Sequence, residues 1–225
     1  MKKIRVVLLL VVFYLLSSSI SFALEKPTHA EINKFIATNS MNGFSLDIYL
    51  RNQLGFVNGI KKEFKSTETK KVWEWIRDGG QCEDEPAYTR SRNHFHDPLK
   101  TWDQAGLNSG IFTGISSALW IQDQTNRRST DLGGDWSWRK AREFYYAALT
   151  GYSLPLEGFE VDEDLFTHTI IDGSTNMNEA DRNRFFAWTF RAVGQTMHLV
   201  QSILLEMQMG YGKSSSSKGD GRMII

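Results

Sequence analysis

The sequence predicts an all-α fold, and three observations support that prediction. The 225 residues include only four prolines, which leaves room for long uninterrupted helices. No stretch of useful length alternates apolar and polar residues as a half-buried strand does. The C-terminal part has apolar residues at alternating steps of three and four, the spacing of one helix face. These residues are Phe186, Phe190, Val193, Met197, Val200 and Leu204.

Start and stop signals locate the individual helices. Ser45 and Ser137 precede amphipathic runs that end at Gly55 and Gly151, the pattern of an N-cap serine and a C-terminal glycine. The pair Gly79-Gly80 is expected to end another helix. The predicted helices are 28–37, 46–54, 70–78, 114–124, 137–150 and 178 to at least 200, with a long loop region over 81–113.

The N-terminus has the pattern of a cleaved secretory signal peptide. Lys2, Lys3 and Arg5 precede an apolar run, and Ser21-Phe22-Ala23 offers small residues at both positions that a signal peptidase reads. The apolar run, Val6–Leu16, is shorter than the roughly 20 residues of a membrane-spanning helix. We therefore predict an exported protein, periplasmic or extracellular, with no transmembrane segment after cleavage. The predicted organisation is a signal peptide over 1–23, a helical domain over 24–209 and a disordered low-complexity tail over 210–225.

Charge and cysteine content limit the possible partners and stabilising bonds. The chain has 26 basic and 26 acidic residues, and removing Lys2, Lys3 and Arg5 with the signal leaves a formal charge of −3. This balance indicates no patch specific for nucleic acid and no strong attraction to an anionic membrane. Cys82 is the single cysteine, so an internal disulfide framework is excluded.

Histidine and carboxylate residues are the candidates for metal binding. Of the five histidines, His29, His94 and His198 lie in helix or turn contexts that could present a ligand. The carboxylates near His94 in the sequence that could join it are Glu83, Asp84 and Asp97. Neutral imidazole and carboxylate oxygen are common zinc ligands. Spacing alone does not separate a metal site from buried structural histidines.

Four sequence blocks, in this order, resemble the bacterial zinc-dependent phospholipase C family. Thr28-His29-Ala30-Glu31-Ile32-Asn33 is similar to the family's opening helix, and the acidic block Glu83–Tyr88 follows. Asn93-His94-Phe95-His96-Asp97-Pro98 resembles the family's Ser-His-Phe-Tyr-Asp-Pro. Val193–Gln201 resembles its Leu-Gly-x-x-x-His-Tyr-Leu-Gly.

The resemblance implies an all-α domain with up to three zinc ions and hydrolysis of a phosphodiester, such as a phospholipid headgroup. By resemblance, His94 and His198 share one zinc with Asp84, for which Glu83 is the rival, and Asp84 orients or deprotonates the attacking water. His29 would bind another zinc together with the mature N-terminal amine. His96 occupies a position that the family does not use as a ligand.

Other residues near these blocks receive structural interpretations. His96 is interpreted as a histidine that either supports a metal ligand or packs the loop, Asp97 as a residue that caps or orients the loop, and His168 as a surface residue.

The sequence departs from the family after His198. The family continues with a zinc-bridging aspartate four residues later and with further histidines, whereas this chain has Ser202 and no later histidine. Glu206, one turn beyond, is a candidate substitute. The departure fits either a frame change or truncation after Gln201, or a shortened relative that kept the fold and lost the chemistry.

Two alternatives to a phospholipase C-like hydrolase stay open. The zinc-dependent single-strand nucleases share the fold and metal site, and His94-Phe95-x-Asp97 fits their pattern too. Ser202 favours the other alternative, a non-catalytic exported helical protein.

Overall fold

The computed structural model is mostly helical and describes residues 26–108, 113–124, 133–151 and 177–216. The predicted signal peptide, the predicted N-terminal amine and His168 lie outside these residues. Among the described residues, no helix has the length and apolar character that crossing a membrane requires. The elements are α2 (Lys26–Thr38), α3 (Leu46–Leu54), η1 (Gly59–Lys61), β1 (Glu63–Lys65), β2 (Thr69–Lys71), α4 (Val72–Cys82), α5 (Ala87–Arg90), η2 (Ser91–His94), α6 (Ser117–Gln122), α7 (Trp138–Thr150) and α8 (Glu179–Ser216).

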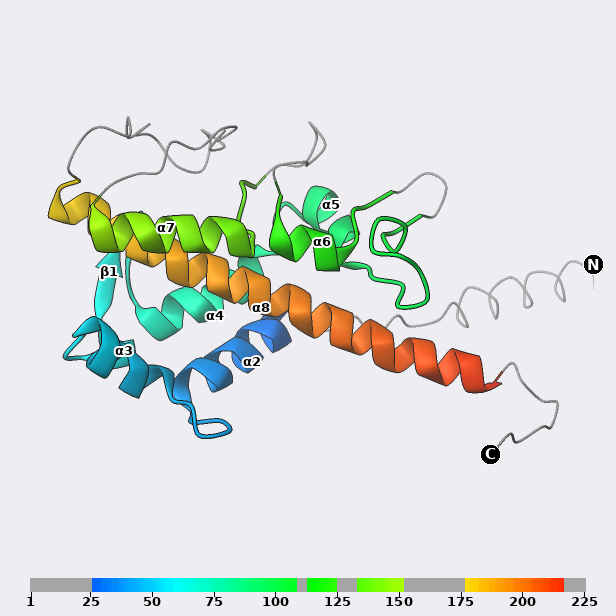
Figure 1. The fold of residues 1–225 in the computed structure, drawn as a ribbon, viewed down its shortest axis with the longest axis horizontal. Coiled ribbons are helices and arrows are strands. Elements are labelled where there is room, and N and C mark those ends of the chain that lie inside the picture. The colour runs from blue at the N-terminus through cyan, green and yellow to red at the C-terminus, as the bar shows by residue number, and fades with distance from the viewer. Residues whose placement is uncertain (1–25, 109–112, 125–132, 152–176, 217–225) are drawn as a thin grey trace, which may run out of the picture.

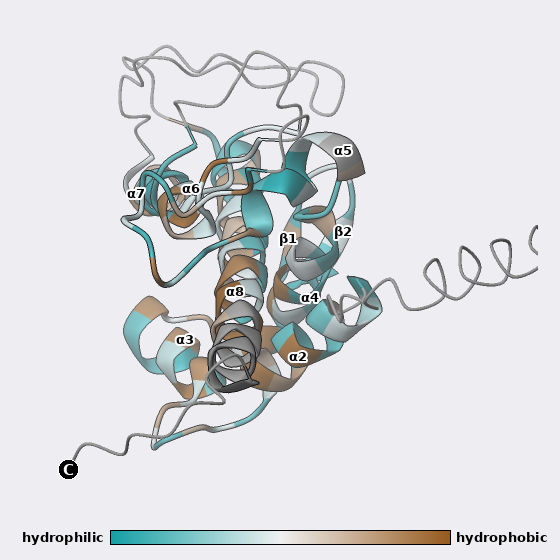
Figure 2. Ribbon diagram, turned by 90° about the vertical axis from the view of Figure 1, so that its right-hand side faces the viewer, coloured by the Kyte–Doolittle hydropathy of each residue, from teal (hydrophilic) through white to brown (hydrophobic). Residues whose placement is uncertain are grey.

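Helix α8 is the centre of the fold. Helices α6 and α7 pack on one side of it and α2 and α4 on the other, so that the other helices surround it when it is viewed end-on (Figures 1 and 2). The main core lies where α4 meets the first half of α8, and Trp75, Ile76, Phe186 and Phe190 are buried there. Burying these large apolar side chains is the main favourable term that holds the elements together.

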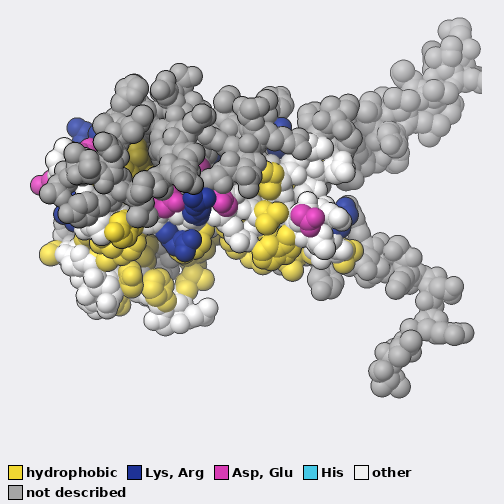
Figure 3. All heavy atoms as spheres, turned by 45° about the horizontal axis from the view of Figure 1, so that its top comes forward, with side chains coloured by type: hydrophobic (Ala, Val, Ile, Leu, Met, Phe, Trp, Pro, Cys, Tyr) yellow, Lys and Arg dark blue, Asp and Glu magenta, His cyan; other side chains and the backbone are white. Residues whose placement is uncertain are grey.

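The C-terminal end of α8 extends beyond the helical body (Figure 1). The predicted apolar stripe is therefore a core stripe only at its beginning, because Val200 and Leu204 are exposed. Apolar side chains also reach the surface elsewhere, among charged ones (Figure 3). The helix continues to Ser216, which corrects the prediction of a coil from residue 210 for the first seven residues of that tail.

The predicted caps of α3 and α7 are confirmed. The Ser45 side chain accepts a hydrogen bond from the Ile48 amide, and Ser137 does the same for Lys140. Gly55 and Gly151 follow with φ of 68° and 77°, the left-handed conformation that closes a helix at little cost for glycine. These boundaries are determined by residues within one helical turn.

Gly79-Gly80 does not end its helix, contrary to the sequence prediction. Both residues lie inside α4, and their missing side chains allow neighbouring helices to approach. A Cβ atom at Gly79 would lie 2.9 Å from the Cα of Gly194 in α8, and one at Gly80 would lie 2.6 Å from the side-chain nitrogen of Asn33 in α2. The two glycines thus mark the place where α2, α4 and α8 come together.

A short antiparallel hairpin corrects the expectation of no strands. Glu63 pairs with Lys71, and Lys65 with Thr69. Each strand has three residues, and Phe64 is the one fully buried side chain between them. A strand of three residues cannot display the alternation that would reveal it in the sequence. The predicted 81–113 loop likewise contains α5 and η2, both a single turn long.

Candidate metal centre

Three of the four predicted metal ligands converge at one place. Asp84 follows the end of α4, His94 ends η2, and His198 lies in α8, and one ligand atom from each falls within 4.8 Å of the others. Asp84 Oδ1 lies 3.5 Å from His94 Nδ1 and 3.9 Å from His198 Nε2. His198 thus forms one nitrogen- and oxygen-donor cluster with two residues that lie more than one hundred positions away in the sequence.

The separations fit a small divalent cation. Tetrahedral zinc with ligand bonds near 2.0–2.1 Å places its donor atoms about 3.3 Å apart. The two separations from Asp84, 3.5 and 3.9 Å, are close to that value, and all three donor atoms lie within 4.8 Å of one another. Binding of such a cation would require the donor atoms of Asp84, His94 and His198 to move closer together. The donor set suits zinc and other N/O-binding metals alike.

His198 is held in the form that a metal requires. Its Nδ1 lies 2.6 Å from the Gly80 carbonyl oxygen, which can only accept, so Nδ1 carries the proton and Nε2 keeps its lone pair. Burial, together with the nearby His94 and His29, lowers the pKa of His198 to about 3. A ligating histidine commonly donates its second ring nitrogen to a carbonyl in this way.

Asp84 and His94 complete the cluster from the loop after α4. Burial raises the pKa of the Asp84 carboxyl, because the protein removes water from its charged form. The buried Nε2 of His94 has no hydrogen-bond partner and lies 3.8 Å from Glu83 Oε1. Burying the Asp84 charge costs free energy when no cation is bound. A bound cation would compensate this cost.

His29 lies beside this cluster rather than inside it. Its ring stacks on the ring of His198 with centroids 3.7 Å apart, and its Nδ1 lies 2.8 Å from Gln201 Oε1. Burial lowers the pKa of His29, which favours the neutral ring. The N-terminal amine predicted to share a metal with it lies outside the described residues.

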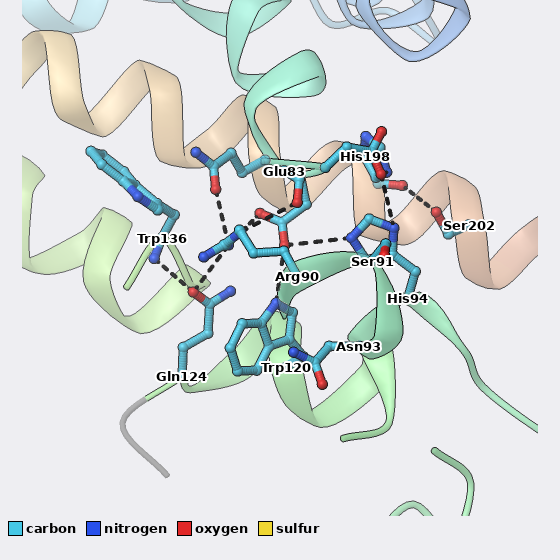
Figure 4. Close-up of polar contacts among 12 residues, drawn as sticks. Glu83, Arg90, Ser91, Asn93, His94, Trp120, Gln124, Trp136, His198 and Ser202 are labelled. Carbon is cyan, nitrogen blue, oxygen red and sulfur yellow. Dashed lines mark hydrogen bonds and ion pairs between the residues drawn. The ribbon is translucent and has the colours of Figure 1, made fainter. Parts of the chain in front are cut away.

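Glu83, the rival ligand in the sequence analysis, belongs to a buried ion pair instead. Its Oε2 accepts a hydrogen bond from Arg90 Nη2 at 2.6 Å, and its Oε1 accepts one from Trp120 Nε1 at 3.0 Å (Figure 4). Glu83 and Arg90 are 0% and 1% exposed in their side chains. With both carboxylate oxygens committed, Glu83 anchors the segment between Asp84 and His94.

Arg90 connects this segment to the rest of the fold. Its Nη1 donates to the Gly134 carbonyl oxygen, and its Nη2 donates to Gln195 Oε1 of α8. Its guanidinium lies over the Trp120 ring, 5.5 Å from the centroid. Sequence reasoning missed Arg90 and Trp120, because no local pattern marks contacts between distant segments: Trp120 is 37 positions from Glu83, and Arg90 is 105 positions from Gln195.

The remaining predicted residues have structural surroundings. His96 is buried with Nδ1 2.9 Å from Ser116 Oγ, and Asp97 accepts a hydrogen bond from the Leu99 amide, which confirms the packing interpretation of His96 and the capping interpretation of Asp97. The Ser202 hydroxyl donates to the His198 carbonyl oxygen. The side chain of Glu206 lies outside the described part, so its suggested substitution is a prediction only.

Acid should destabilise the metal-free chain. Unfolding restores the ordinary pKa of His198, 6.5, so the unfolded chain binds an extra proton between about pH 6.5 and pH 3. The free energy of unfolding should therefore fall with falling pH, by up to about 1.4 kcal/mol per pH unit from this group. Urea unfolding with a chelator, between pH 6 and pH 5, measures the slope.

The control for this prediction is His198→Gln, whose amide can still donate to the Gly80 carbonyl. In this variant the free energy of unfolding should depend less steeply on pH, by the contribution of about one bound proton. Equal slopes in the two proteins would show that His198 is not the titrating group.

The carboxyl of Glu83 has a pKa lowered to about 2, although burial opposes its charge. It therefore adds a similar loss of unfolding free energy only below pH 4.5. Arg90 is the main cause of the lowered Glu83 pKa, because the 3.8 Å between Glu83 Oε1 and His94 Nε2 is too long for a hydrogen bond.

Comparison with known proteins adds no assignment to this geometry. No family model, no curated protein and no solved structure matches the chain.

Proposed function

We propose that this chain is a zinc-binding phosphodiester hydrolase of the phospholipase C type, with an all-α multi-helix domain. The observation that supports the proposal is the convergence of Asp84, His94 and His198. Two imidazoles and one carboxylate make three protein ligands, the number typical of catalytic zinc sites that keep one position for water or substrate. Structural zinc sites usually use four protein ligands, and most of them include cysteine.

Each of the three residues has a separate task in this proposal. His198 and His94 present nitrogen atoms from a rigid helix and from a segment fixed by the Glu83–Arg90 pair. Asp84, partly exposed at the edge of the cluster, can also orient a water molecule or accept its proton. Zinc, when bound there, supplies a water of near-neutral pKa and neutralises the phosphodiester charge.

A second candidate function is a non-catalytic exported zinc protein. The observation that favours it is Ser202, where the resemblance places a bridging carboxylate. The Ser202 hydroxyl is engaged with the backbone oxygen of His198. Such a protein would bind zinc through the same three residues and would not turn over a phosphodiester.

Hydrolysis of a chromogenic phosphocholine ester by the zinc-loaded chain tests the proposed activity. We expect turnover that falls at least 100-fold in His94→Ala, because one of three zinc ligands is lost. His96→Ala is the matched control, since His96 bonds to Ser116. Turnover no higher than that of His94→Ala, with zinc bound, would overturn the hydrolase and leave the non-catalytic protein. Cleavage of single-stranded DNA in preference to phosphatidylcholine would instead identify the nuclease alternative.

A further inference from the structure

A chain of side-chain hydrogen bonds connects two helices to the ring of His29. The Asn33 side-chain nitrogen donates to the carbonyl oxygens of Ile76 in α4, at 3.0 Å, and of Gly194 in α8, at 2.9 Å. The Gln201 side-chain nitrogen donates to Asn33 Oδ1 at 2.8 Å. Gln201 Oε1 then lies 2.8 Å from His29 Nδ1. Asn33 is fully buried, so water does not compete for the two bonds that its side-chain nitrogen donates.

The direction of every bond in this chain follows from its origin. Backbone carbonyl oxygens only accept, so Asn33 must direct its NH₂ group toward Ile76 and Gly194 and its oxygen toward Gln201. Gln201 must then donate to that oxygen, which leaves its own oxygen facing His29. A hydrogen bond to an amide oxygen requires a proton on His29 Nδ1. In the neutral ring, Nε2 is consequently unprotonated.

We propose that Asn33 and Gln201 are positioning residues that hold His29 as its Nδ1–H tautomer, with the Nε2 lone pair available beside the Asp84–His94–His198 cluster. A neutral histidine side chain in water favours the opposite, Nε2–H tautomer, so the arrangement reverses the intrinsic preference. The function of that lone pair, to bind a metal or accept a proton, rests on the proposed function. The tautomer itself does not.

The neighbouring His198 supports this assignment through an independent bond. Its Nδ1 donates to the Gly80 carbonyl oxygen, so the two stacked rings share one protonation pattern. Gly80 also makes room for the chain of bonds, because a Cβ atom there would lie 2.6 Å from the Asn33 side-chain nitrogen. The Gly80 carbonyl oxygen therefore orients His198, and the absence of a side chain at Gly80 leaves room for Asn33.

Nitrogen NMR of the histidine rings in the metal-free full chain tests the proposal at a pH where the rings are neutral. We expect His29 to show a protonated Nδ1 and an unprotonated Nε2. In Gln201→Met, which keeps the length and removes both polar groups, the majority of His29 should change to the Nε2–H form. Gln201→Glu retains an acceptor and should keep the Nδ1 proton.

Gln122→Met is the matched control, since Gln122 is exposed on α6 and bonds only within that helix among described residues. It should leave the His29 signals unchanged. A protonated Nε2 in the natural sequence, or an unchanged tautomer in folded Gln201→Met, would overturn the proposal. The role of the His29 lone pair is tested separately by the zinc dissociation constant, which should rise about 10–100-fold in Gln201→Met if His29 contributes to the metal site. An unchanged constant with a changed tautomer would retain the positioning role and exclude His29 from the metal.

Discussion

Replacing Arg90 with methionine should lower the free energy of unfolding by about 3–5 kcal/mol at pH 7. Methionine can occupy much of the same apolar space, but it leaves the fully buried Glu83 carboxylate without its partner. The Gly134 and Gln195 oxygens would also lose their donors. Because small domains are stable by only about 5–15 kcal/mol, a large share of the total would be lost. Urea unfolding followed by circular dichroism measures the change.

Arg139→Met is the matched control for this loss. Arg139 also pairs with two carboxylates, Asp123 and Glu143, but its side chain is 39% exposed, so its removal should cost under about 1 kcal/mol. The loss of unfolding free energy in Arg90→Met should be smaller at acidic pH, because Glu83 becomes protonated there and no longer needs a cation. A loss as small as that of Arg139→Met would contradict the structural role of the Glu83–Arg90 pair.

Serine and glycine at the helix ends predicted the boundaries of α3 and α7 from the sequence. The boundaries of α3 and α7 depend on Ser45, Gly55, Ser137 and Gly151, each acting within one turn of backbone. The prediction for Gly79-Gly80 was wrong because these glycines serve the packing of one helix against others rather than the end of a helix. Glycine inside a helix is unfavourable by itself, and only the approach of α2 and α8 explains it.

The candidate site was predictable to the extent that its residue types are distinctive. His94, His198 and Asp84 were identified from their order and from the resemblance of their surroundings, and the structure places them together. The supporting residues carry no such signal. Gln201 reads as one polar residue on an amphipathic helix, and Asn33, its hydrogen-bond partner, lies 168 positions away in the sequence.

Loss of either histidine ligand should abolish tight zinc binding. His94→Ala or His198→Ala would leave one imidazole and one carboxylate, and two protein ligands seldom hold zinc against water and buffer. We expect the dissociation constant to rise at least 100-fold in each variant. The helical circular dichroism signal at neutral pH should be retained, because each change removes one side chain. His96→Ala, which removes a buried histidine that bonds to Ser116, should bind zinc as the natural sequence does.

Zinc bound per purified chain, measured by elemental mass spectrometry, tests the central claim most directly. The Asp84–His94–His198 centre predicts at least one zinc per natural chain and per His96→Ala chain, and a near-complete loss in His94→Ala and His198→Ala. A folded natural chain without zinc, or one whose zinc survives both ligand substitutions, would contradict the metal centre.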